Sequence, residues 1–229
     1  MTSQVSTATL LHRKRRLDKL RIDTCFGPSG CPNAVGRSHG LADRIESLLK
    51  GADFLGFLKS KGIEDLKFHH EFRVTLADCP NACSQPQIKD IGILGALIPG
   101  ISDEACTACG ACVETCREAA ISLKQGAPEP TVDMQRCLAC GACIPVCPTG
   151  TLVEGPAGYR IQLGGKLGRH PQLARELPGI YDAAAILEII SACIELYKTK
   201  SRKGERFGQI LQPKDFDELV ERFKKTAEN

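Results

Sequence analysis

The feature that most constrains this chain is a cysteine-rich unit that occurs twice. The first copy reads EACTACGACVETCREAAISL and the second reads QRCLACGACIPVCPTGTLVE, so Cys106 corresponds to Cys137 and Cys116 to Cys147. In each copy three cysteines follow at intervals of two residues, and a fourth comes three residues later. Small residues between them let the backbone fold closely and point N–H groups at sulfur. An internal repeat therefore occupies roughly residues 103–154.

This spacing matches the ligand pattern of bacterial ferredoxins with two [4Fe–4S] clusters, in which the fourth cysteine of each run reaches across to the other cluster. Structural zinc sites normally use cysteine pairs, and three cysteines at successive intervals plus a fourth overfill a tetrahedral site. The repeat thus predicts an inserted ferredoxin domain over 103–154. The pattern assigns one cluster to Cys106, Cys109, Cys112 and Cys147, and the other to Cys137, Cys140, Cys143 and Cys116.

Four of the other five cysteines form a second kind of pattern. Cys25 and Cys31 stand in TCFGPSGCPNA, and Cys79 and Cys83 stand in DCPNACS, directly after the strand-like FRVTLAD. Four thiolates from two such loops can close a site for zinc or for one [4Fe–4S] cluster, and spacing leaves both open. The fifth, Cys193, lies in an apolar helical stretch, where we expect it to behave as a small hydrophobe.

Cysteine usage also bounds the cellular context. Thirteen cysteines in 229 residues is an odd count in a chain too long to need disulfide staples, and most stand in tight C-x2-C spacing. The N-terminus lacks a secretory h-region, and the longest apolar stretch, 91–101, is too short to span a bilayer. A net charge of +3 gives no argument for nucleic acid. We expect a cytoplasmic protein with no membrane or nucleic-acid partner.

The rest of the chain predicts an α+β fold around the repeat. Residues 1–24 read as a polar arm with a basic run at 13–21. Apolar periodicity predicts strands at 72–78, 91–98 and 159–163, and helices near 41–50, 182–197 and 215–225. The simplest account is one domain in two pieces, 25–102 and 155–229, with the ferredoxin domain inserted between them.

At this point the motifs resemble a known family. TCFGPSGCPNA and DCPNACSQP resemble the sirohaem and [4Fe–4S] domain of the sulfite and nitrite reductases, and GYRIQLGGKLGRHPQLA resembles that family's strand and Gly-Gly loop. A ferredoxin domain inserted between these parts resembles the dissimilatory sulfite reductase subunits. The chain length is similar to that of small sulfite reductase-type proteins of anaerobes. The resemblance implies a sulfite reductase-like α/β domain and a third [4Fe–4S] cluster beside a sirohaem.

The resemblance also implies roles for individual residues. Cys25, Cys31, Cys79 and Cys83 would ligate the third cluster, and Cys83 would bridge it to the haem iron and so act in catalysis. The haem carboxylates need basic partners. The candidates are the 13–21 run, Arg37, Lys166, Arg169 and His170.

Together these features lead to one expected function and one alternative. The first is reduction of a small inorganic anion, sulfite or nitrite, by electrons that pass from a ferredoxin-like or other redox donor through the ferredoxin clusters to the Cys83 centre. Larger family members carry a second half-domain, so a homo- or hetero-oligomer would complete the haem site here. The alternative is an iron–sulfur electron-transfer protein or subunit without functional sirohaem.

Overall fold

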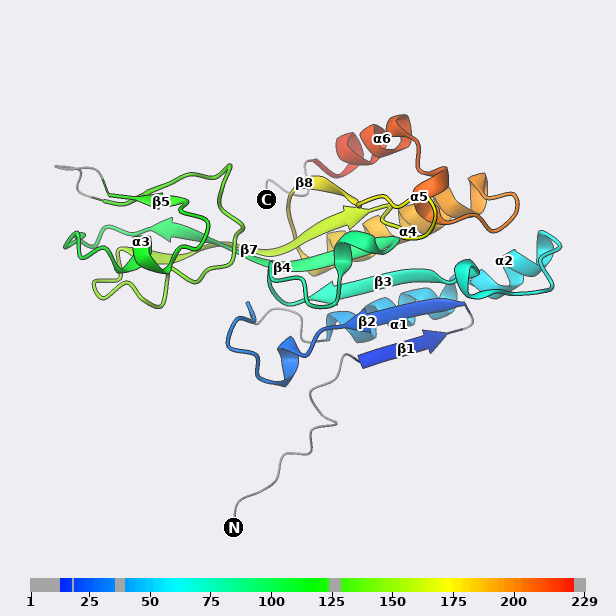
Figure 1. The fold of residues 1–229 in the computed structure, drawn as a ribbon, viewed down its shortest axis with the longest axis horizontal. Coiled ribbons are helices and arrows are strands. Elements are labelled where there is room, and N and C mark those ends of the chain that lie inside the picture. Colours follow the sequence, from blue (N-terminus) through cyan, green and yellow to red (C-terminus); the bar gives the residue numbers. More distant parts are fainter. Residues whose placement is uncertain (1–12, 18, 36–39, 124–128, 225–229) are drawn as a thin grey trace, which may run out of the picture.

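The main element of the fold is a six-stranded mixed sheet with the strand order β1-β2-β3-β4-β7-β8 (Figure 1). The computed structural model describes residues 13–17, 19–35, 40–123 and 129–224. Strands β2, β3 and β4 are parallel, whereas β1 runs antiparallel to β2, β7 to β4 and β8 to β7. The strands span Arg13–Leu17 (β1), Leu20–Thr24 (β2), Phe72–Ala77 (β3), Ile91–Ile101 (β4), Leu152–Leu163 (β7) and Arg175–Tyr181 (β8).

The helices fall close to their predicted positions. The apolar stripe of Leu41, Ile45 and Leu49 faces the core from α1, and the Asp182 carboxylate caps α4 by accepting from the N–H of Ala185 at 2.7 Å. Within the described residues, no helix is long and apolar enough to cross a lipid bilayer. The helices are α1 Leu41–Gly51, α2 Phe54–Ser60, α3 Ala111–Thr115, α4 Ala183–Lys200, α5 Phe207–Ile210 and α6 Pro213–Phe223, with short 3-10 turns at Gly27–Ser29, Phe68–His70 and Pro86–Ile88.

The core lies between one face of the sheet and the helices, with α1 and α4 behind the sheet in Figure 1. Period-two alternation puts Ile22, Val74 and Ile91 on this face, where each is fully buried. Burying a side chain of this size contributes about 1.5–3 kcal/mol. Cys193 is fully buried in α4, which confirms its expected place in the core, and burial raises the pKa of its thiol.

The opposite face of the sheet is polar, yet it is also covered. The connection between β3 and β4, residues 78–90, crosses it, and the Thr75 hydroxyl lies within hydrogen-bond distance of the carbonyl of Ser84 in this connection, at 3.3 Å, and of the carbonyl of Asp23, at 3.0 Å. Asp23 also pairs with Arg21 at 2.8 Å and with Lys89 at 3.5 Å. The expectation of a polar arm over 1–24 is therefore wrong for residues 20–24, which form the buried strand β2 because the charges at 21 and 23 satisfy each other.

Residues 102–151 form a lobe at the end of the sheet (Figure 1, left). Strands β4 and β7 pair from Ile91–Leu163 out to Ile101–Leu152, so the lobe sits on an extended hairpin. It contains α3 and a two-stranded sheet of β5 (Ile121–Ser122) and β6 (Thr131–Val132). The repeat predicts an insert that ends at 154, but residues 152–154 belong to β7. The lobe has its own small core, formed by Cys112, Ile121, Cys143 and Leu152.

Candidate metal-binding site

The parallel pairing of β2 and β3 brings two cysteine loops together. Parallel strands end at the same edge of a sheet, and the loops beyond their carboxyl ends are where ligands bind in open α/β sheets. Cys25 directly follows β2, and Cys79 comes two residues after β3. The two loops enclose one pocket that contains all four cysteines predicted to act together. Its lining is Cys25, Phe26, Gly27, Cys31, Asn33, Ala34, Ala77, Asp78, Cys79, Asn81 and Cys83.

Close backbone packing holds the two loops against each other. A Cβ atom added to Gly27 would come within 2.3 Å of the Asp78 carboxylate, so only glycine fits at this position. The N–H of Val35 donates to the Asp78 carbonyl at 3.0 Å. Gly95 of β4 also lies against this loop, since a Cβ atom added to Gly95 would be 2.5 Å from the same Asp78 carbonyl oxygen. The pocket therefore rests on the central strands of the sheet.

Hydrogen bonds already point at two of the sulfur atoms. The N–H groups of Gly27 and Asp78 donate to Cys25 Sγ at 3.3 and 3.2 Å, and the Asn81 side-chain amide donates to Cys83 Sγ at 3.0 Å. Burial nevertheless raises the pKa of Cys25 and of Cys79, and the neighbouring thiols raise it further. These thiols become thiolates when a metal centre compensates for their charge.

The donor set fits a thiolate-bound metal centre. Four sulfur atoms with N–H donors behind them are the ligand environment of iron–sulfur clusters, and thiolates also select zinc. The four thiols surround a pocket rather than one point. Among the described residues, no three His, Cys, Asp or Glu side chains are arranged around a single metal ion.

The cysteine loops of the pocket and of the lobe share one backbone feature. The alanine that precedes each of Cys83, Cys109 and Cys140 adopts the left-handed conformation, which side chains other than glycine rarely occupy. Such a residue reverses the chain within a very short loop and brings the next cysteine inward. These are Ala82, Ala108 and Ala139, with φ of 55°, 54° and 55°.

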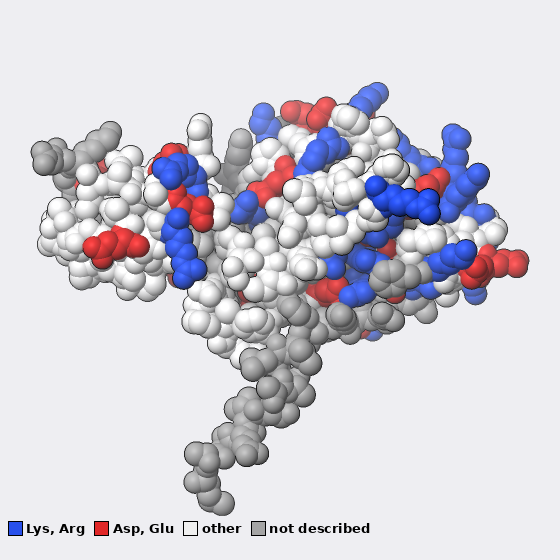
Figure 2. All heavy atoms as spheres, viewed as in Figure 1, with Lys and Arg blue, Asp and Glu red and all other residues white. Residues whose placement is uncertain are grey.

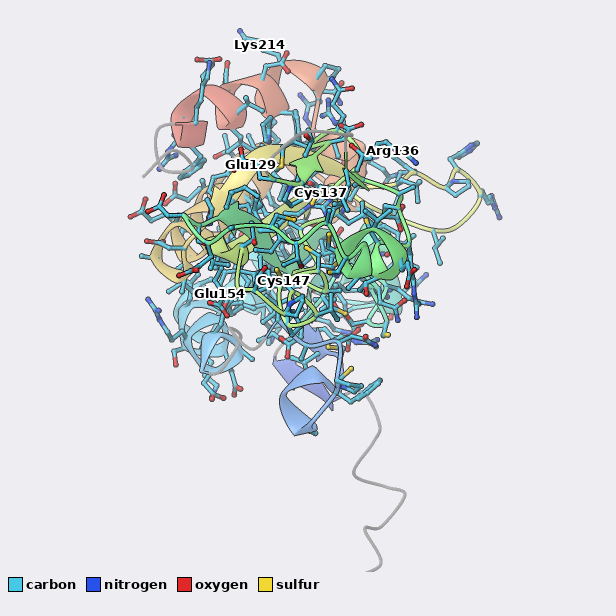
Figure 3. All side chains as sticks on the ribbon, turned by 90° about the vertical axis from the view of Figure 1, so that its left-hand side faces the viewer. Glu129, Arg136, Cys137, Cys147, Glu154 and Lys214 are labelled. Atoms are coloured by element: carbon cyan, nitrogen blue, oxygen red, sulfur yellow. The ribbon has the colours of Figure 1, made fainter. Side chains whose placement is uncertain are left out.

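In the lobe, the structure places Cys116 of the first run near the second run. Burial raises the pKa of Cys143 to about 11, with further contributions from the thiols of Cys140, Cys137 and Cys116. Cys147 packs against the same small core, and the N–H of Leu152 holds its pKa down at about 7. Figure 3 looks onto this lobe and labels Cys137 and Cys147.

Three of the predicted basic residues lie away from the pocket. Lys166, Arg169 and His170 lie in the loop after β7, whose last residue pairs with the start of β4, at the opposite end of the sheet from the cysteine loops (Figure 1). Lys166 is buried, and its ammonium group donates to the carbonyl of His170 in the same loop. Arg37 lies outside the described residues, as do the side chains of 13–17. The described lining of the pocket contains no Lys or Arg.

Figure 2 agrees with this distribution. Blue side chains gather over the sheet body toward α2 and α5, and the region of the cysteine loops is largely uncharged in this view. One basic residue that the sequence did not single out does reach a cysteine run: Arg160 of β7 donates to the carbonyl of Leu138 at 3.1 Å. Its place follows from the pairing of β7 with β8, which sets Gln162 opposite Glu176 and lets Arg160, two residues earlier, reach the same carboxylate at 2.6 Å.

Comparisons with known families and proteins identify the relatives of this chain. The profile of the family described as "Nitrite and sulphite reductase 4Fe-4S domain" matches residues 18–229. The coenzyme F420-dependent sulfite reductase of Methanocaldococcus jannaschii is 31% identical over 85% of this chain and 30% of its own length. One of the anaerobic sulfite reductase subunits of Salmonella typhimurium is 27% identical over 46% of this chain and 27% of its own.

Among solved structures, a dissimilatory sulfite reductase I superposes with a TM-score of 0.55 and 19% identity, covering 88% of this chain and 51% of that chain. This likeness establishes the mixed sheet and helix arrangement. The chain spans less than a third of the length of the two relatives above.

Proposed function

The chain belongs to the nitrite and sulphite reductase 4Fe-4S domain family, which covers nearly all of it, and on that premise we propose that it is an iron–sulfur and sirohaem oxidoreductase that reduces sulfite or nitrite. The observation that carries the proposal is the pocket at the ends of β2 and β3, which is lined by Cys25, Cys31, Cys79 and Cys83. Four cysteines from two loops, with N–H groups aimed at sulfur, suit one [4Fe–4S] cluster.

The cysteines of this pocket differ in burial and in the hydrogen bonds that their sulfur atoms receive. Cys79 is the buried one of the four cysteines, and the N–H groups of Gly27 and Asp78 stabilise negative charge on half-buried Cys25. Cys83 is half-buried and receives the exposed amide of Asn81. Its place as the last cysteine of DCPNACS, which matches the family's motif, supports Cys83 as the ligand shared with the haem iron. When bound, the two groups would supply electrons to an anion in single steps.

The lobe would serve as a two-cluster ferredoxin module that feeds this centre. The grouping of Cys116 with Cys137, Cys140 and Cys143 supports the crossed ligand assignment, which leaves Cys106, Cys109, Cys112 and Cys147 for the other cluster. Cys109 and Cys140 are exposed, which suits exchange with a ferredoxin-like or other redox donor. With the pocket of the body, the chain would hold three [4Fe–4S] clusters.

The basic groups that bind the anion and the haem carboxylates would come largely from elsewhere. The described lining of the pocket is free of Lys and Arg, and this chain covers 51% of the similar reductase chain. A second copy or a partner subunit would complete the haem site. Arg169 and His170, exposed at the other end of the sheet, would then serve a different surface.

The same observation favours a second candidate. Without added basic groups the haem site would be incomplete, and the chain would pass electrons to a partner without reducing an anion itself. The presence of bound haem in the purified protein distinguishes the reductase from the electron carrier.

The deciding test is the visible spectrum of anaerobically purified protein, with iron and acid-labile sulfide counted on the same sample. Chlorin-type bands and iron for three cubanes plus one support the reductase, and added sulfite should perturb those bands. A broad brown spectrum without haem bands, from cells that make sirohaem, supports the electron carrier. Cys83→Ser should abolish haem–cluster coupling and leave both lobe clusters intact; unchanged coupling would remove Cys83 from the bridging role.

A further inference from the structure

The second cysteine run is mounted directly on the sheet. The N–H of Leu97 in β4 donates to the carbonyl of Ala139 at 2.7 Å, and Leu97 forms an isolated bridge with Cys140. Gly141 is so close that an added Cβ would lie 2.8 Å from the Leu97 side chain. The loop between Cys137 and Cys143 therefore takes its position from the body of the protein.

The first run, although alike in sequence, has no such support among the described contacts. The carbonyl of Ala108, which corresponds to Ala139, accepts no backbone hydrogen bond from the sheet. Gly110, which corresponds to Gly141, has nothing within 4 Å of an added Cβ. The two runs thus hold their cysteines in the same local geometry but in different surroundings.

A charged clamp adds to the support of the second run. Arg160 donates through Nη1 to the carbonyl of Leu138 at 3.1 Å, and through Nε and Nη2 to both carboxylate oxygens of Glu176 at 2.6 and 2.9 Å. Gln162 donates to the same carboxylate at 2.9 Å. A bidentate pair of this kind fixes the plane of the guanidinium group. Arg160 is consequently held in place with one N–H directed at the cysteine loop.

The carbonyl that Arg160 binds belongs to a peptide group with a second task. The Leu138 carbonyl and the Ala139 N–H lie on opposite sides of one planar peptide, and this N–H donates to Cys137 Sγ at 3.4 Å. A cation on the oxygen polarises the peptide and strengthens the N–H donor. In the first run the Ala108 N–H makes the equivalent bond to Cys106 Sγ at 3.3 Å, and no Arg reaches the carbonyl behind it among the described contacts.

We infer that Arg160 is a positioning residue for the cluster of the second run. Through the Leu138–Ala139 peptide it directs an N–H at Cys137 and makes the reduction potential of that cluster more positive, because hydrogen bonds to sulfur favour the more negative, reduced state. The inference rests on the proposed function for the clusters of the lobe. It attributes to Arg160 a difference in reduction potential between two clusters whose cysteine runs have nearly the same sequence pattern.

The test is an equilibrium redox titration of the intact holoprotein, followed by electron paramagnetic resonance, for wild type and Arg160→Gln. The midpoint potential of one lobe cluster should fall, and that of the other should stay unchanged. Arg136→Gln is the matched control, because exposed Arg136 precedes Cys137 in the chain, whereas the described hydrogen bond to the Leu138 carbonyl comes from Arg160. The control removes the same charge beside the same run and should produce a smaller shift.

Two further variants separate position from charge. Arg160→Lys keeps the positive charge but loses the planar guanidinium group that binds Glu176 and Leu138 together. Glu176→Gln keeps the arginine itself but weakens the ion pair that orients it. Both variants should lower the midpoint potential of the same cluster. Equal shifts in both clusters, no shift in either, or an Arg136→Gln shift as large as that of Arg160→Gln would overturn the inference. Should Arg160→Gln not retain its clusters, Glu176→Gln carries the comparison. The titration needs neither haem nor sulfite, so its result is independent of whether the chain reduces an anion.

Discussion

At the scale of single residues, the Asn81 amide is the side-chain donor that most directly adjusts the pocket, because it reaches Cys83 Sγ at 3.0 Å. Asn81→Ala should lower the reduction potential of the [4Fe–4S] cluster proposed for this pocket. A net hydrogen bond of about 1 kcal/mol corresponds to about 40 mV for a one-electron couple. Asn33→Ala is a matched control, since Asn33 lines the same pocket and the described side-chain bond to sulfur there comes from Asn81. A redox titration that shows equal shifts in both variants would contradict the role of Asn81.

A second residue-scale prediction concerns the turn between α4 and α5. Partial burial works against ionisation of Glu205, but the N–H groups of Lys203 and Arg202 and the hydroxyl of Ser201 hold its pKa down at about 2, against an ordinary 4.5. A lowered pKa stabilises the fold above pH 4.5, and this stability is lost as the pH falls toward 2.

Glu205→Gln should therefore lower the free energy of unfolding at pH 7 by about 1 kcal/mol, a value reduced by the exposure of the group. The deficit should stay constant from about pH 8 to 5.5 and shrink only below about 4.5, where the unfolded carboxylate takes up its proton. Denaturant unfolding of both proteins at each pH measures it, with the exposed Glu188→Gln as control. A deficit that grows toward low pH would show the opposite linkage.

At the scale of elements, contact with β4 should make the second cysteine run more sensitive to substitution than the first. Gly110 and Gly141 hold corresponding positions with φ of 81° and 66°, so alanine at either costs roughly 1 kcal/mol of left-handed strain. Gly141→Ala must also displace Leu97 of β4. We expect Gly141→Ala to lose cluster iron and thermal stability well beyond Gly110→Ala, and Leu97→Ala to restore part of the loss. Equal losses in the two glycine variants would show that β4 does not support the second run.

The elements also show where sequence reasoning succeeds and where it stops. Strand β3 and helix α1 follow directly from apolar periodicity, and both lie within a residue or two of their predicted ranges. Sequence reasoning misses strand β2 because Arg21 reads as part of a basic run and Asp23 as part of a polar arm. Their alternation with Leu20 and Ile22 carries the signal, but the buried pairing between the two charges appears only once β2 has a neighbour.

At the scale of the whole molecule, the cysteines of the pocket could be predicted as a group from their spacing and from the family motif, and the parallel pairing of β2 and β3 brings their loops together. The basic loop at 164–174 could not be placed, because its end of the sheet depends on the direction of β7. Antiparallel pairing of β7 with β4 sends that loop away from the pocket. Strand direction, which no local pattern encodes, thus decided which predicted site residues meet.

If the lobe holds the two proposed clusters, its folding should depend on them. Two of the four buried hydrophobic side chains in its core are cysteines, Cys112 and Cys143, with Ile121 and Leu152 as the others. So small an apolar core cannot offset the conformational entropy of about fifty residues. Removal of iron by a chelator should open 102–151 to proteases while the body resists, with cleavage sites mapped by mass spectrometry. Uniform cleavage of body and lobe, or a lobe that stays resistant without iron, would contradict this.

The hairpin that carries the lobe also makes it portable. Ile101 and Leu152 face each other as the last antiparallel pair, and paired Cα atoms lie only about 4.5–5.5 Å apart. A two-residue Asn-Gly turn could close that gap and excise the roughly fifty residues between them without shifting a strand. The shortened protein would keep the four cysteines of the pocket without the two cysteine runs of the lobe. The same junction would accept an unrelated module, which makes this strand pair a natural splice point for building redox chains of chosen length.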